Sequence, residues 1–159
     1  MPELRTDRLR LTPLGRAHVE HYTAWMPEED ARRETAASDA HWREHGFGPW
    51  AVLEDDRFVG FAEVHYAGGG IGGIAPDEVE VGWVIADDRQ KLGLATEAMT
   101  AAIADAWTRA GTDHVVAYIR PWNKASIRVA EKLGFRVRGE GRTRSGDPAT
   151  IYVLDAPAA

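Results

Sequence analysis

Residues 88–96 read DRQKLGLAT and stand between an apolar, strand-like run at Val79–Ile85 and an alanine-rich helical pattern at Gly93–Ala110. This order predicts a strand, a short loop and a helix. The first amides of a helix have no partner inside the helix, and the helix dipole adds positive potential at the same end. Gly93 and Ala95 carry no bulky side chain, so an anion such as a pyrophosphate can approach the main chain closely. We therefore expect an anion site at this turn.

A second segment, residues 123–135, reads NKASIRVAEKLGF and predicts another helix. Asn123 belongs to the residue types that cap helix N-termini, and its side chain can also reach a ligand. Gly134 stands where a helix usually ends. Together the two segments indicate a pocket for a phosphate-bearing, amide-rich molecule such as coenzyme A.

Composition limits the function classes. The chain has 159 residues, 44% of them hydrophobic and 28% charged, which favours one globular domain spanning residues 1–159. It has no cysteine, which excludes disulfides, thiolate metal sites and a cysteine nucleophile and makes the cytoplasm the expected compartment. A net charge of −6 disfavours a nucleic acid partner and suits a cationic substrate such as an amine. We also expect no membrane-spanning segment, no secretory signal and no metal site, because none of the corresponding patterns is present.

Periodicity and turn residues predict the secondary structure. Strands are expected at Arg8–Thr12, Pro49–Glu54, Arg57–Tyr66, Glu78–Ile85, His114–Ile119, Phe135–Gly139 and Ala149–Leu154, and helices at Gly15–Met26, Glu28–Glu44, Gly93–Ala110 and Asn123–Leu133. Asp55 and Asp56 mark a hairpin between two of these strands. The glycine-rich tract Ala67–Pro76 indicates a mobile loop, and its residues Gly68–Gly73 could act as a lid on the acceptor side. Hairpins dominate the first half and strand–helix alternation the second, so the fold class is α+β with a mixed sheet.

Several stretches of the chain resemble the motifs of a known family. Residues 90–95, QKLGLA, match the Gln/Arg-x-x-Gly-x-Gly/Ala signature of the GNAT superfamily of acetyl-CoA-dependent N-acetyltransferases. More narrowly, the chain resembles the Rim-type branch, whose founding members acetylate the N-termini of ribosomal proteins. The supporting stretches are LRTDRLRL at 4–11, GFGPWAV at 46–52, EVGWVI at 80–85, ATEA at 95–98 and NKASIRVAEKLGF at 123–135. One departure is Lys91, where the branch often has glycine, although a lysine amide can still donate a hydrogen bond.

The resemblance implies a GNAT-type single domain with acetyl-CoA as co-substrate. Its central sheet is expected to be twisted and mostly antiparallel, with about six or seven strands, a splayed parallel pair and about four flanking helices. An amide at Val84 or Ile85 is expected to polarise the thioester carbonyl. Asn123 is expected to bond the pantetheine arm. The backbone of Trp83, Val84 and Ile85 is expected to pair with that arm, and the N–H groups of Gln90, Lys91, Leu92, Gly93, Leu94, Ala95 and Thr96 to hold the pyrophosphate.

Acetyl transfer also needs a proton acceptor for the amine and a donor for the leaving thiolate. The resemblance points to Glu80 as the base, acting directly or through water, with Glu63 as the alternative. Glu78 shares a strand face with Glu80, so alternation alone does not separate them. His65 could relay a proton instead. Ser126 corresponds to the branch serine proposed to protonate the thiolate, and the tyrosine that other superfamily members use one turn later is here Ala130.

Three functions remain open from the sequence. The first is an N-acetyltransferase whose acceptor is a protein N-terminal α-amine or a small-molecule amine. The second is a non-catalytic acyl-CoA-binding module, and the third, a nucleotide-binding domain, lacks its usual fingerprint here. Trp25, Trp42 and Trp83 are expected to line the acceptor side, and the resemblance implies a homodimer as one assembly.

Overall fold

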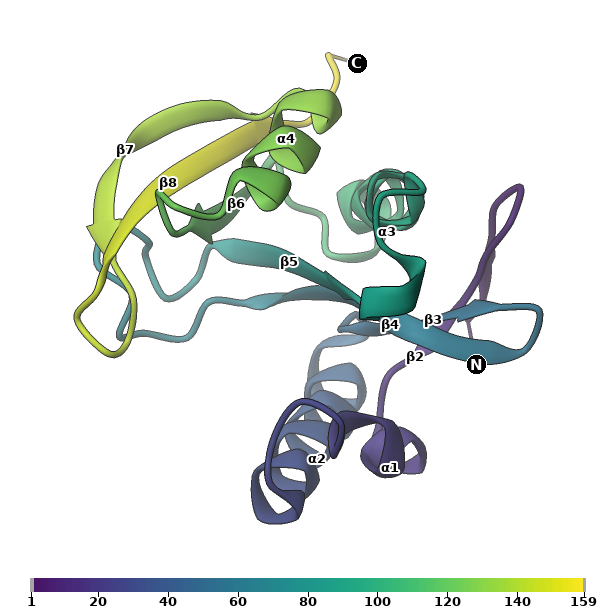
Figure 1. The fold of residues 1–159 in the computed structure, drawn as a ribbon. Coiled ribbons are helices and arrows are strands. Elements are labelled where there is room, and N and C mark those ends of the chain that lie inside the picture. Colours follow the sequence, from purple (N-terminus) through teal and green to yellow (C-terminus); the bar gives the residue numbers. More distant parts are fainter. Residues whose placement is uncertain (1, 159) are drawn as a thin grey trace.

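Residues 2–158, the part that the computed structural model describes, form a single eight-stranded sheet with helices on both faces (Figure 1). The strands lie in the order β1-β2-β3-β4-β5-β6-β8-β7. Their bounds are Leu4–Arg5 (β1), Arg10–Pro13 (β2), Trp50–Glu54 (β3), Arg57–Tyr66 (β4), Val79–Ile85 (β5), His114–Ile119 (β6), Arg136–Arg142 (β7) and Pro148–Asp155 (β8). The helices are Val19–Tyr22 (α1), Glu28–His45 (α2), Leu94–Arg109 (α3) and Lys124–Leu133 (α4), with 3-10 turns at Arg16–His18 (η1) and Asp87–Arg89 (η2).

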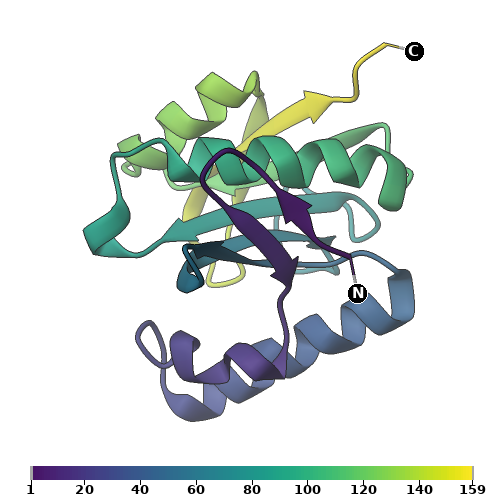
Figure 2. The same ribbon diagram turned by 90° about the vertical axis from the view of Figure 1, so that its right-hand side faces the viewer.

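The helices divide between the two faces of the sheet. Figure 2 shows α3 and α4 on one side and α1 and α2 on the other. The larger core lies under α3 and includes Met99, which is fully buried, together with Val64 and Val81 from the sheet. A smaller core under α1 and α2 contains Tyr22 and Phe61. The mixed α+β class and the four helices expected from the sequence are confirmed.

Among the strands of residues 2–158, β5 and β6 are the one pair that runs parallel, and this pair is the central feature of the sheet. β5 and β6 are connected through α3, and they share a single register pair, Glu80 with Val116. β4 and β5, by contrast, pair over seven residues. β5 and β6 therefore separate toward the end of β5 that leads into α3, which is the splayed pair expected from the resemblance.

Turn chemistry explains why the β3–β4 hairpin was predictable. Asp55 and Asp56 both adopt positive φ, 49° and 63°, as the two central residues of a type I′ turn do. The α2 boundary is equally local: Gly46 ends the helix with φ 75°. Two expectations were less accurate. Helix 15–26 is only a 3-10 turn followed by the four-residue α1, and the additional strand β1 has two residues.

The expectation of a free glycine-rich lid is wrong, because the tract is fastened in its middle. Gly72 exchanges backbone hydrogen bonds with Arg142 of β7, at 2.9 and 3.2 Å. Ile71 and Ile74 are buried in a cluster against β6 and β8. A Cβ at Gly141 would lie 2.1 Å from the Gly72 carbonyl oxygen, so the close approach of the two backbones requires glycine. Within residues 2–158, no helix is long and apolar enough to cross a membrane.

Candidate active site

The N-terminus of α3 presents unpaired amides. Gly93 precedes the helix in the left-handed conformation, with φ 80°, and the first bond into the helix runs from the Glu97 N–H to the Gly93 carbonyl at 3.0 Å. The amides of Leu94, Ala95 and Thr96 therefore have no partner inside the helix. Lys91 also has a positive φ, 65°, which is a physical reason for glycine at this position in the branch. The turn has the geometry of an anion site.

Side chains from distant segments hold this loop in place. Arg8 donates from Nη1 to the Leu92 carbonyl at 2.8 Å and from Nε to Glu97 Oε1 at 2.8 Å. Gln90 donates from Nε2 to the Ile85 carbonyl at 2.9 Å and so ties the loop to the end of β5. Sequence reasoning gave no role to Arg8 or Glu97, because these contacts join residues about ninety positions apart.

A cavity of about 490 Å³ lies in front of the free amides. Its lining comes from β5, the loop, α3 and α4: Trp83, Ile85, Arg89, Gln90, Lys91, Gly93, Leu94, Ala95, Thr96, Asn123, Ala125, Ser126, Arg128, Val129 and Lys132. Nearly all predicted donor-binding residues are in this set. Two are absent, Leu92, which is exposed, and Val84, which packs on the opposite face of the sheet. The cations Arg89, Arg128 and Lys132 were missed: Arg128 and Lys132 are exposed basic residues of α4, which have no distinctive sequence pattern, and Arg89 is held in η2 by an ion pair with the distant Glu54.

A second cavity, of about 360 Å³, fills the opening between β5 and β6. Trp83, Asn123 and Ser126 line both cavities, so the two meet at these residues. Tyr118 and the exposed Trp122 form part of its outer wall. The arrangement is a groove that leads from the free amides of α3 through the sheet.

The hydrogen-bonding pattern of β5 decides which of its amides face that opening. Ala86 donates to the Val59 carbonyl and Ala67 to the Glu78 carbonyl, so residues with even numbers between 78 and 86 direct their backbone groups toward β4. The Val84 N–H is therefore used in the β4–β5 ladder. The N–H groups of Trp83 and Ile85 point to the β6 side, beyond the single β5–β6 pair. Of the two amides expected to polarise a carbonyl, the one on the open edge belongs to Ile85.

Asn123 and Ser126 lie at the start of α4. Asn123 Oδ1 accepts a hydrogen bond from the Ser126 N–H at 3.2 Å, so the asparagine caps the helix, and its Nδ2 donates to no other group within residues 2–158. The Ser126 side chain lines the junction of the two cavities. Ala130, at the position of the superfamily tyrosine, is fully buried against the core. Trp83 Nε1, beside the same junction, is buried without a hydrogen-bond partner among residues 2–158.

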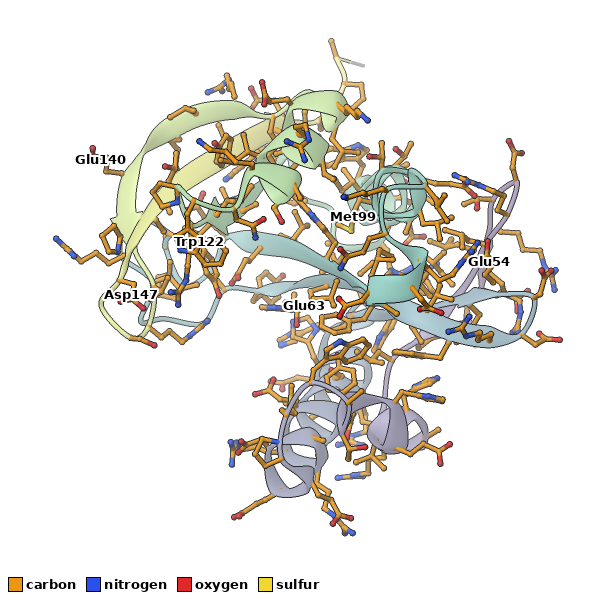
Figure 3. All side chains as sticks on the ribbon, in the orientation of Figure 1. Glu54, Glu63, Met99, Trp122, Glu140 and Asp147 are labelled. Atoms are coloured by element: carbon orange, nitrogen blue, oxygen red, sulfur yellow. The ribbon has the colours of Figure 1, made fainter. Side chains whose placement is uncertain are left out.

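The two candidate bases lie on the opposite face of the sheet from α3. Glu63 pairs with Gly82 and His65 with Glu80 across β4 and β5, so all three titratable side chains share the face toward α1 and α2. Figure 3 shows Glu63 on this side and Met99 on the α3 side. Glu63 Oε2 is next to Gly82, 3.3 Å from where a Cβ would be. Glu63 is therefore adjacent to the lining of the second cavity, whereas Glu80 lies at the single β5–β6 pair where the opening begins; neither carboxylate lines a cavity itself.

Their environments differ. Glu80 is only 4% exposed, and its Oε2 has no hydrogen-bond partner among the described residues. Burial raises the pKa of Glu80, against the opposing attraction of His65. For His65, burial opposes protonation, but the nearby Glu63 carboxylate and the hydrogen bond to the Tyr66 carbonyl raise its pKa to about 9. His65 is thus a cation at neutral pH and a poor proton acceptor there.

The tryptophans have different positions. Trp83 lines both cavities, but on the α3 and α4 side. Trp25 is partly exposed and packs on Phe58 and Phe61 near the acceptor face. The expectation for Trp42 is wrong: its ring packs edge-on against Trp50, and its Nε1 donates to the Pro49 carbonyl, so it joins α2 to β3.

Comparisons with known proteins agree with this geometry. Residues 8–136 match the family model described as "Acetyltransferase (GNAT) domain". A GnaT-family acetyltransferase from Bordetella pertussis is 28% identical, with a TM-score of 0.86 over 96% of this chain and 99% of that one. A structure from Vibrio cholerae, described as a ribosomal-protein-serine acetyltransferase, has a TM-score of 0.76, 18% identity and 98% coverage of both chains. RimJ from Mycobacterium smegmatis, in complex with CoA-disulfide, has a TM-score of 0.72 at 19% identity, over 93% of this chain and 82% of that one.

Proposed function

The chain belongs to the GNAT acetyltransferase family, and we propose that it moves the acetyl group of acetyl-CoA to a primary amine, either the α-amine of a protein N-terminus or a small-molecule amine. GNAT acetyltransferases use acetyl-CoA, and the structural neighbours include Rim-type ribosomal-protein acetyltransferases. We assign the activity to the whole chain as one catalytic domain.

The observation that carries this proposal is the position of the free α3 amides. They face a cavity that continues into the β5–β6 opening, and two carboxylates lie next to this opening on the opposite face of the sheet, Glu63 beside Gly82 and Glu80 at the β5–β6 pair. The residues present fit the donor: Leu94, Ala95 and Thr96 supply unpaired N–H groups for a diphosphate, and the buried Trp83 Nε1 and the Asn123 Nδ2 supply further donors. A thioester would thus enter from the α3 side and an amine from the α2 side.

The chemistry follows from this placement. Bound acetyl-CoA supplies an activated acyl group. In this proposal the Ile85 N–H, on the open edge of β5, stabilises negative charge on the carbonyl oxygen, as an oxyanion-hole donor does. The Glu80 carboxylate accepts the proton of the amine, directly or through water, because burial raises its pKa toward the range in which a base works best. The Ser126 hydroxyl, at the junction of the cavities, donates a proton to the departing thiolate.

Glu63 is the weaker candidate for the base. Its Oε2 lies 3.9 Å from His65 Nε2, and His65 is charged at neutral pH. Glu80 has a cation at a similar distance, Arg144 at 4.0 Å from its Oε2, but it is much more deeply buried than Glu63, and burial raises the proton affinity of a carboxylate. We therefore assign Glu63 the orientation of the cationic amine and Glu80 the proton transfer.

Two measurements test the function. Calorimetry should give binding of acetyl-CoA with a Kd of about 10 µM or below. A panel of amines, including N-terminal peptides, polyamines and aminoglycosides, should then release thiol from acetyl-CoA above the rate without amine. Absence of heat at tens of micromolar would contradict donor binding. Binding without thiol release from any amine would point instead to a non-catalytic acyl-CoA-binding module.

A further inference from the structure

The turn between β7 and β8 directs an arginine at the proposed base. Arg144 Nη2 lies 4.0 Å from Glu80 Oε2, and the same nitrogen donates to the Ala67 carbonyl at 2.8 Å. Its aliphatic stem covers Gly70, where a Cβ would be 3.4 Å from Arg144 Cγ. The guanidinium is therefore held between two segments, the glycine-rich tract and β5, which both lie more than sixty positions before Arg144 in the sequence.

The turn that carries Arg144 is itself tightly bonded. Thr143 is buried, its N–H donates to the Asp147 carbonyl at 2.9 Å, and its hydroxyl accepts from the Asp147 N–H at 3.2 Å. Gly146 donates to the Thr143 carbonyl at 2.9 Å. These bonds fix the backbone on both sides of Arg144, so its direction is set by the fold although half of its side chain is exposed.

Few groups can balance the charge of Glu80. His65 and Glu63 face it from β4, Tyr118 from β6 and Arg144 from the β7–β8 turn. His65 attracts the carboxylate most strongly, but its Nε2 also lies 3.9 Å from Glu63 Oε2, and its Nδ1 donates to the Tyr66 carbonyl at 2.8 Å. Among residues 2–158, Arg144 makes its only ion pair with Glu80.

We propose that Arg144 is a positioning residue, which keeps the Glu80 carboxylate ionised and directed toward the β5–β6 opening. This inference rests on the proposed function, in which Glu80 is the base. Without Arg144, His65 would be the one cation left near the buried Glu80 carboxylate. Because Glu63 also lies close to His65, the stabilisation of ionised Glu80 would be weaker. Arg144 thus makes the proton-accepting form of Glu80 available at a lower pH than burial alone would allow.

The test measures the titration of Glu80 directly. The side-chain carboxyl carbon of Glu80 is followed by NMR in the full-length protein and is assigned by its disappearance in Glu80→Gln. Arg144→Gln should raise the midpoint by roughly half a pH unit or more, an effect that high salt should reduce because the pair is partly exposed. In Arg144→Lys, which keeps the positive charge, the titration midpoint of Glu80 should stay nearer to that of the parent protein. Arg142→Gln is the matched control on the same hairpin, because the Arg142 side chain bonds the Gly146 carbonyl and no carboxylate among the residues that the structure describes. Arg144→Met, which keeps a stem over Gly70, replaces the glutamine variant should that one not fold.

Each outcome has a separate meaning. An unchanged midpoint in both neutral Arg144 variants would overturn the role of Arg144, whatever their activity. A raised midpoint together with an equal upward shift of the acidic limb of kcat/KM would support both Arg144 and the base. A raised midpoint with an unmoved limb would support the role of Arg144 toward Glu80 and contradict only the assignment of Glu80 as base.

Discussion

Glu80 and Glu63 lie on the same face of neighbouring strands, but they do not have the same chemistry. Glu80 is buried with one carboxylate oxygen unpaired, whereas Glu63 is half-buried beside a charged His65. Glu80→Gln should lower kcat by about 10²–10⁴-fold, the usual contribution of a general base, and leave acetyl-CoA affinity nearly unchanged. Glu63→Gln should mainly raise the KM of the amine.

The role of Glu80 as the base also predicts how kcat/KM changes with pH. Because the ionised form of Glu80 accepts the proton, kcat/KM should rise with pH through the raised pKa of this group. Steady-state kinetics from pH 5 to pH 9 measure this limb. Equal kcat values for Glu80→Gln and the parent would contradict the role of Glu80 as the base. A much larger loss of kcat in Glu63→Gln would assign the base to Glu63 instead.

Ser126 offers a second test at the residue scale. Ser126→Ala keeps the backbone N–H that bonds Asn123, so the cap of α4 should survive. The variant should lose roughly tenfold or more in kcat, near the low end of acid catalysis, because a thiolate is a good leaving group even without protonation. Stopped-time thiol release measures the loss, and Ser145→Ala, on the exposed β7–β8 turn, is the control. A kcat equal to that of the parent would show that Ser126 lines the cavity without acting as the proton donor.

At the scale of elements, the start of α3 is the part on which donor binding depends. Ala95 lies in the first turn, where a carboxylate would interact favourably with the helix dipole but would repel a diphosphate. Ala95→Asp should therefore keep or slightly raise the unfolding free energy while it weakens acetyl-CoA binding by about tenfold or more. These opposite signs separate loss of the site from loss of the fold.

The same helix provides a matched control. Ala104 is exposed in the middle of α3, so Ala104→Asp adds the same charge away from the free amides. Calorimetry and chemical denaturation on both variants decide the question. Equal acetyl-CoA affinities for the two variants would contradict a diphosphate site at this helix end.

At the scale of the whole molecule, His41 connects α2 to the sheet. Its Nδ1 bonds the Phe47 carbonyl at 2.8 Å, and its Nε2 accepts from the Tyr66 N–H at 3.0 Å, so the ring is neutral. Burial lowers the pKa of His41 below its usual value. A depressed pKa means that the unfolded chain binds the proton more readily, so this contribution to stability is present above about pH 6.5 and is lost as the pH falls through the lower folded pKa.

This linkage predicts that the parent and the variant His41→Gln differ in unfolding free energy by an amount that depends on pH. His41→Gln should be less stable than the parent by roughly 1 kcal/mol at pH 8, the usual net value of a hydrogen bond, and the difference should shrink toward pH 5. Urea denaturation at several pH values measures both free energies of unfolding. A pH-independent difference would show that His41 contributes packing but not titration.

The sequence by itself determined the features that depend on neighbours along the chain. β4, β6 and the β3–β4 hairpin were predicted with the bounds that the structure has or within one residue of them, because alternation and the Asp55-Asp56 turn are local signals. The Gly93 turn and the capping Asn123 were predictable for the same reason. The family signature in this loop correctly indicated acetyl-CoA as the donor.

Only the tertiary structure decided how distant segments complete the site. Arg8 on the Leu92 carbonyl, Arg144 on Glu80 and the fastening of the glycine-rich tract by Arg142 all join residues more than sixty positions apart. The burial that distinguishes Glu80 from Glu63 and the edge that leaves the Ile85 amide free also depend on which strands become neighbours. A local pattern carries no information on these contacts, because sheet order and side-chain burial are set by packing of the whole chain.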